Sequence, residues 1–180
     1  MRASRFSGGP AWLQALTLAA ALALGLAPEA APTGAEAPLP EDEARMLLQR
    51  YVASWDLDAL LAEPPVAREF QALPAAAREQ LLRNLSVRGT IDVYGGALSI
   101  MGNAPHRGGE DEALLCVEVL GGAVRLHAAI LSGGRVTVHT RGEQYSYLPI
   151  CVRDWVAVVS TGHHYRFRPP ANLELVRLPE

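Results

Sequence analysis

Two hydrophobic periodicities divide the chain at about residue 86. Before this point, apolar residues recur at intervals of three and four, which is the spacing of helices that bury one face. The longest such stripe is formed by Leu47, Leu48, Tyr51, Val52 and Trp55. After this point, apolar and polar residues alternate, which is typical of strands. We therefore predict one α+β domain over residues 38–180, with a helical layer over 38–85 packed on an antiparallel sheet over 86–180.

The predicted helices have recognisable starts and breaks. Glu41-Asp42-Glu43 places negative charge where the dipole of a first helix favours it. Asp56 is suited to cap a short second helix, which Pro64-Pro65 interrupts. A further helical stretch restarts at Pro74 and runs to Leu85. The pattern thus predicts several short helices rather than one long one.

Glycine doublets separate the predicted strands. They are Gly95-Gly96, Gly108-Gly109, Gly121-Gly122 and Gly133-Gly134. Glycine adopts positive φ without steric cost, so a doublet between alternating runs is a hairpin signal. The expected strands of the meander are Val87–Tyr94, Ala97–Gly102, Glu112–Leu120, Ala123–Leu131 and Arg135–Arg141. Segments 165–168 and 173–178 are extended in pattern, and an edge strand there would make six.

The strand register follows from setting apolar residues opposite apolar residues, because a slip of one residue reverses the faces. A two-residue turn at Gly121-Gly122 places Val117 opposite Leu126. A three-residue turn over 132–134 places Ala128 opposite Val138, and the simplest third loop sets Ile100 opposite Val117. One face of the sheet is then aliphatic throughout, and we expect the helices to cover it. Residues 149–160 favour a helix with proline in its first turn, although their β-branched residues leave a strand as the alternative.

The same register gathers polar side chains on the opposite face. One row contains Cys116, His127 and His139. These residues are candidates for a nucleophile with its base, or for three zinc ligands. The favoured interpretation is structural, with Cys116 bridged to Cys151 in an oxidising compartment.

A second row on that face contains Glu118, Arg125 and Arg141. Glu118 opposite Arg125 is an ordinary cross-strand ion pair. Arg125 opposite Arg141 brings like charges together, which a bound carboxylate or phosphate would relieve. These three residues are therefore the candidate site for a small anionic ligand.

The first 37 residues have the pattern of a leader. Arg2 and Arg5 precede an uncharged apolar run from residue 11 to residue 26, and small residues follow at Ala35 and Ala37. This order is that of a cleavable secretory signal peptide with a flexible lead-in. The apolar run is shorter than a spanning helix needs, so membrane attachment is expected only if the leader stays uncleaved.

The charge of the chain and the motifs that it lacks argue against several classes of function. All 16 basic residues are arginine and the net charge is −3, with no basic stripe for nucleic acid. No nucleotide-binding loop, hydrolase elbow or CxxC motif is present. We predict an exported, periplasmic or secreted, non-enzymatic binding domain of the bacterial cell envelope, without a cofactor, whose partner is an envelope protein or a small anionic ligand. The alternative is a small enzyme or zinc site that uses the Cys116, His127 and His139 row.

Overall fold

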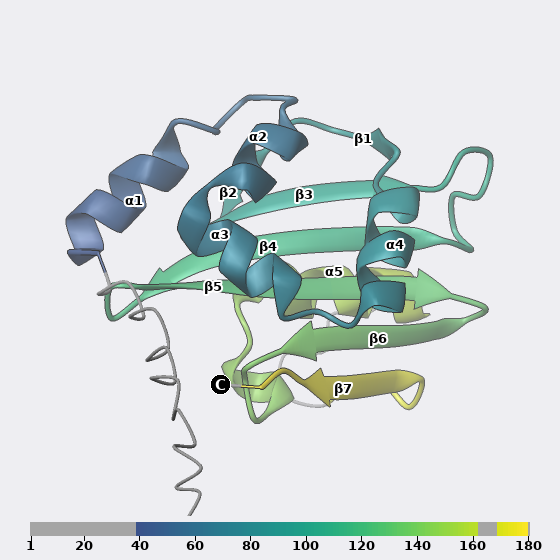
Figure 1. Cartoon of the computed structure of the whole chain (residues 1–180). Coiled ribbons are helices and arrows are strands. Elements are labelled where there is room, and N and C mark those ends of the chain that lie inside the picture. Colours follow the sequence, from purple (N-terminus) through teal and green to yellow (C-terminus); the bar gives the residue numbers. More distant parts are fainter. Residues whose placement is uncertain (1–38, 162–168, 180) are drawn as a thin grey trace, which may run out of the picture. The chain divides into compact units, whose positions relative to one another are not determined.

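A seven-stranded sheet lies between two helical layers (Figure 1). The computed structural model describes residues 39–161 and 169–179. The leader predicted over 1–37 and the extended segment predicted at 165–168 lie outside the described residues. The α+β class and the largely antiparallel sheet predicted from the sequence are confirmed.

Four short α-helices precede the strands, and a fifth lies between the sixth and the seventh strand of the chain. Their bounds are α1 Glu41–Gln49, α2 Leu57–Ala62, α3 Pro64–Gln71, α4 Ala75–Asn84 and α5 Ile150–Thr161. Asp56 caps α2 as predicted, and its side chain accepts a hydrogen bond from the Ala59 N–H at 2.9 Å. Pro64 and Pro65 end α2 and also begin α3, because proline suits the first turn of a helix. Trp55 lies beyond α1 and is 63% exposed, so the predicted apolar stripe is shorter than expected.

The sheet differs from a simple meander at both edges. The strands are β1 Val87–Arg88, β2 Asp92–Tyr94, β3 Ala97–Asn103, β4 Glu112–Leu120, β5 Ala123–Ser132, β6 Arg135–Thr140 and β7 Leu173–Arg177. The first predicted strand is split into β1 and β2, which both pair with β3. At the other edge β7 pairs with β6 in parallel, so the sheet is not wholly antiparallel.

The predicted register is correct between β4 and β5 and wrong between β3 and β4 and between β5 and β6. Val117 lies opposite Leu126 as predicted, whereas β3 is displaced by two residues and sets Leu98 opposite Val117. The β5–β6 turn contains only Gly133 and Gly134, both at positive φ, and Ala128 therefore lies opposite His139. This one-residue difference turns every β6 side chain to the face opposite the predicted one.

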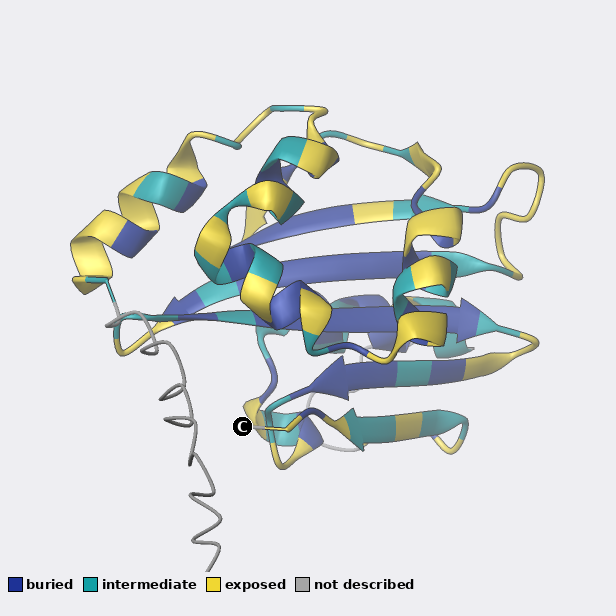
Figure 2. Cartoon of the chain, in the orientation of Figure 1, coloured by how far each residue is buried: buried dark blue, intermediate teal, exposed yellow. Residues whose placement is uncertain are grey.

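Both faces of the sheet are buried (Figure 2). Helices α1–α4 pack on the aliphatic face, as predicted, over Ile100, Leu115, Val117, Leu126 and Ala128. The opposite face is also covered, because the helix predicted at 149–160 forms as α5 and buries Val152 and Trp155 in one cluster with Leu114 and Val138. The second face is therefore a core rather than an open surface. Within the described part of the chain, no helix combines the length and the apolar character needed to cross a membrane.

Candidate interaction site

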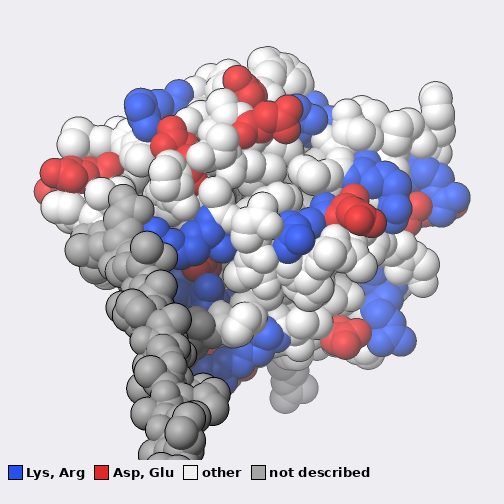
Figure 3. Space-filling view, in the orientation of Figure 1, with Lys and Arg blue, Asp and Glu red and all other residues white. Residues whose placement is uncertain are grey.

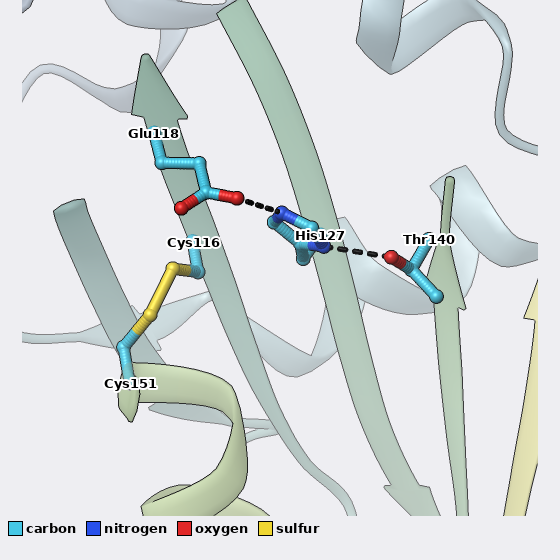
Figure 4. Close-up of a disulfide and its surroundings, with 5 residues drawn as sticks. All are labelled: Cys116, Glu118, His127, Thr140 and Cys151. Atoms are coloured by element: carbon cyan, nitrogen blue, oxygen red, sulfur yellow. Dashed lines mark hydrogen bonds and ion pairs between the residues drawn. A yellow bond between two sulfur atoms is a disulfide. The ribbon is translucent and has the colours of Figure 1, made fainter. Parts of the chain in front are cut away.

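A disulfide joins the sheet to helix α5 (Figure 4). Cys116 in β4 and Cys151 in the first turn of α5 are bonded at an S–S distance of 2.10 Å, and both residues are buried. The predicted bridge is therefore present. Because both sulfurs are bonded to each other, Cys116 carries neither the free thiol of a nucleophile nor a thiolate for zinc.

His127 lies beside this disulfide and is held from both sides (Figure 4). Its Nε2 is 3.0 Å from Oε1 of Glu118, and its Nδ1 is 2.8 Å from Oγ1 of Thr140. The contacts suit an imidazole that donates from Nε2 to the carboxylate and accepts at Nδ1 from the hydroxyl. The network ties β4, β5 and β6 together on the α5 side of the sheet.

The chain of hydroxyl, imidazole and carboxylate resembles the order of a hydrolytic triad, but its hydroxyl is inaccessible. Thr140 is fully buried, and its Oγ1 also accepts a hydrogen bond from the Gly142 N–H at 2.8 Å. A nucleophile must reach a substrate, which this oxygen does not. We therefore assign the network of Glu118, His127 and Thr140 a structural role.

His139 does not join Cys116 and His127, because the β6 register carries it to the opposite face. It lies across from Ala128 and borders a cavity beneath α4. In the described residues, no three His, Cys, Asp or Glu side chains are grouped closely enough to hold a metal ion. The predicted Cys116, His127 and His139 row is therefore not assembled.

The predicted arginine pair is separated in the same way. Glu118 lies opposite Arg125, as expected. Arg141, however, contacts α3, where its Nε is 3.1 and 3.0 Å from the two carboxylate oxygens of the buried Glu69. The guanidinium of Arg141 is neutralised there, so Arg125 and Arg141 do not form a joint anion site.

The loop between β3 and β4, residues 104–111, extends well beyond the ends of these two strands (Figure 1). The first of its two turns closes with the Arg107 N–H donating to the Ala104 carbonyl at 3.0 Å. Pro105 holds the second position of that turn, and His106 holds the third with φ of +59°. A turn with proline second and positive φ third has the features of type II, in which glycine is the usual third residue. His106 thus occupies a strained conformation at the tip of an exposed loop.

Internal bonds hold this loop in place. The Ala104 N–H donates to the Asp111 carbonyl at 2.9 Å and closes the base of the loop. Arg107 pairs with Asp111 at 2.9 Å and with Glu110 at 3.1 Å. The hydroxyl of Ser132 donates to Asp111 at 2.8 Å, and this bond together with the Arg107 guanidinium lowers the pKa of the Asp111 carboxyl. The loop is therefore ordered by its own contacts before any partner binds.

Residues 105–110 are all exposed. Since Arg107 pairs with both Glu110 and Asp111, His106 is a side chain of the exposed loop that these ion pairs do not occupy. His106 was not among the residues predicted from the sequence. The sequence did contain a sign of this turn. Proline favours the second position of a turn, so Pro105 places His106 at the third position, where glycine is usual. Gly108-Gly109 indicates a second turn directly after it.

Charge does not separate into a single-sign patch on the face that carries α1–α4 (Figure 3). Acidic side chains gather over the start of α1, and elsewhere acidic and basic groups lie close together among neutral residues.

Comparison with known families gives one result. A family described as inhibitor of vertebrate lysozyme (Ivy) matches residues 65–159. The matched region begins in α3, contains the projecting β3–β4 loop and the disulfide, and ends within α5. No curated protein and no solved structure matches the chain. Because the match spans more than half of the 180 residues, the chain belongs to the inhibitor of vertebrate lysozyme (Ivy) family.

Proposed function

We propose that this protein inhibits a lysozyme by binding it as a protein, and that the β3–β4 loop is the part that enters the enzyme. The observation that carries the loop assignment is His106, an exposed residue at positive φ in a loop fixed by internal bonds. Backbone strain of this kind costs of order 1–3 kcal/mol and is enriched at functional sites. Family membership supports a protein partner of the lysozyme class.

The shape and chemistry of the loop suit the active site of such an enzyme. A lysozyme hydrolyses its polymer in a cleft, with two carboxyl groups flanking the scissile bond. A narrow, ordered loop is complementary to a cleft, and little conformational entropy is lost when it binds because its shape is already fixed. An imidazole offers hydrogen-bond donors to carboxylates. His106 is therefore the residue proposed to reach the catalytic carboxyl groups.

Inhibition of this kind requires that inhibitor and enzyme meet outside the cytoplasm. The disulfide between Cys116 and Cys151 is of the type that persists in oxidising compartments. The basic start and apolar run of the first 26 residues support export, because they have the pattern of a signal peptide. We propose that the protein acts in the periplasm or after secretion.

The test is inhibition of a purified vertebrate lysozyme by the protein and by a His106→Ala variant. Alanine removes the imidazole and leaves the bonds of Arg107 and Asp111 intact. We expect the inhibition constant to rise about 30-fold, which corresponds to the ~2 kcal/mol of a central interface residue. His106→Gly should lose as much inhibition while relieving the backbone strain, so this variant separates the side chain from the turn.

The matched control lies at the other end of β4. Leu120 is 65% exposed, next to the β4–β5 turn. Leu120→Ala should leave the inhibition constant unchanged. If the wild-type protein fails to inhibit lysozyme, the proposed function is wrong; if it inhibits and both His106 variants match it, the function stands and only the loop assignment fails.

A further inference from the structure

A groove of about 450 Å³ lies between the second half of α5 and the short edge strand β1. Its apolar lining includes Val87 of β1, Met101 of β3 and Val158 of α5, each more than half exposed. The buried Trp155 of α5 lies beside them. The volume is within the range of sites that receive a bound group, so the groove is large enough to hold a side chain of a partner.

The charged residues at the border of the groove are engaged within the protein. The guanidinium of Arg88 donates to the carbonyl oxygens of Leu85 and Trp55 at 3.2 and 3.4 Å. The carboxylate of Glu112 accepts a hydrogen bond from the Gly109 N–H at 2.6 Å. A contiguous apolar surface with a polar border is typical of places where one protein binds another. The groove therefore suits an apolar group of a protein partner better than a charged ligand.

The groove is continuous with the β3–β4 loop. Asn103, the last residue of β3, and Glu112, the first residue of β4, both line the groove, and the loop 104–111 joins these two residues directly. Val87 lies opposite Asn103 in the sheet, so β1 and the loop are at the same end of the sheet (Figure 1). A protein that takes this loop into a cleft is thereby brought against the groove.

The loop is too small to form the whole interface of an inhibitor. A complex between an enzyme and a protein inhibitor buries about 800 Å² on each partner, from roughly 20–30 residues. The loop 104–111 supplies far fewer residues, so the surface beside it has to supply the rest. The core of an interface is apolar, and methionine is enriched there. The groove places Met101 and its apolar neighbours directly beside the loop.

We propose that the groove between α5 and β1 is a second contact region for lysozyme, and that it receives an apolar side chain from the rim of the enzyme cleft while the loop occupies the cleft itself. This inference rests on the proposed inhibition of a lysozyme and extends the binding site from one loop to a continuous surface. The groove contributes affinity through the burial of apolar area.

The first test uses methionine methyl groups as probes in the wild-type protein. The protein is isotope-labelled at these methyl groups and mixed with unlabelled vertebrate lysozyme. Met101 lines the groove, whereas Met46 is similarly exposed on α1, far from the loop (Figure 1). We expect the NMR signal of the Met101 methyl group to shift on binding, while the signal of Met46 keeps its position.

The second test replaces apolar groove residues by neutral polar ones, so that long-range charge is unchanged. The double variant Met101→Gln with Val158→Gln should raise the inhibition constant about 30-fold. The matched control is Val93→Gln with Leu120→Gln, because these residues are also more than half exposed but lie at the other end of the sheet. This control should inhibit lysozyme as the wild type does, and thermal unfolding shows that both double variants are folded.

The outcomes separate this inference from the proposed function. A wild-type protein that does not bind lysozyme would overturn both. If the wild type binds but the Met101 methyl signal does not shift, or if the groove double variant inhibits as well as the wild type, this inference alone is wrong. A Met101 signal that shifts with protein concentration in the absence of lysozyme would assign the groove to contacts between copies of this chain, which also contradicts the inference.

Discussion

The glycines of the hairpin turns differ in how closely other parts of the chain pack against them. Gly95 has φ of +64°, and a Cβ added to it would overlap Cγ2 of Ile150 at the start of α5. Gly133 has a similar φ of +56°, but a Cβ added there would meet open space. Gly95 thus allows the β2–β3 turn to approach the start of α5 closely, whereas Gly133 is needed only for the positive φ of its own turn.

We predict that Gly95→Ala and Gly133→Ala destabilise the protein to different extents. Gly133→Ala should lower the free energy of unfolding by about 1–2 kcal/mol, which is the cost of holding alanine in the left-handed backbone conformation. Gly95→Ala also forces the turn away from α5, and its free energy of unfolding should fall by about 3 kcal/mol or more. Urea denaturation of the two variants measures the difference. Equal losses would show that the contact with Ile150 is unimportant.

His139 makes stability depend on pH. Burial lowers the pKa of His139 in the folded protein. In mildly acidic solution this imidazole is therefore protonated to a greater extent in the unfolded chain than in the folded one. The contribution of this residue is present above the ordinary histidine pKa of about 6.5, and it is lost as pH falls below that value. We predict that the free energy of unfolding decreases from about pH 7.5 to about pH 5.5.

The control for this effect is His139→Gln, which keeps a polar side chain but does not titrate. Its unfolding free energy should change less over the same interval in urea denaturation. A wild-type protein whose stability is as insensitive to pH as the variant would contradict the prediction.

His106 shows what the periodic patterns of the sequence did not reveal at the residue scale. Its proposed role rests on its positive φ and on its exposed place in the β3–β4 loop. Neither property leaves a periodic pattern, because a turn is specified by only a few local residues. Cys116 and Cys151, in contrast, were the only two cysteines in a chain expected to be exported, and their bridge could be predicted.

At the scale of elements, most helices and strands were predictable because their patterns were local. The caps and breaks at Asp56, Pro64 and Pro74 correspond to observed helix boundaries. Strands β3 to β6 begin at the predicted residues and end within one residue of the predicted bounds. Glycine doublets and period-two alternation were therefore sufficient to place the strands along the chain.

Pairing between strands was less predictable, because the sheet is buried on both faces. In β5, Ala128 and Ile130 face α1–α4 while Ala129 and Leu131 face α5, so both sets are apolar. Apolar matching then no longer identifies a single register. The three-residue turn predicted over 132–134 satisfied apolar matching but is not the turn that forms, and it carried His139 and Arg141 into the predicted site.

At the scale of the whole molecule, the disulfide fastens the second helical layer to the sheet. Cys116 and Cys151 close a loop of 35 residues that contains β5, β6 and their turns. A bridge that closes a loop of this length lowers the entropy of the unfolded chain, which stabilises the folded protein by about 3–4 kcal/mol. We predict that Cys116→Ala and Cys151→Ala each lower the free energy of unfolding by about this amount in urea denaturation.

Reduction of the wild-type protein is the matching control, and it should reproduce the loss in both variants. Lysozyme inhibition under native conditions should persist, since the β3–β4 loop is held by its own bonds around Arg107 and Asp111. Stability unaffected by reduction would mean that α5 stays in place without the bridge.

The split of the first strand into β1 and β2 has a consequence for how the protein behaves among other proteins. An uninterrupted edge strand offers a row of free backbone groups on which another chain can build a continuous sheet. Here the edge beside β3 consists of two and three residues, separated at 89–91. Such an edge is a poor template for the addition of another strand, so this side of the sheet is protected against edge-to-edge aggregation.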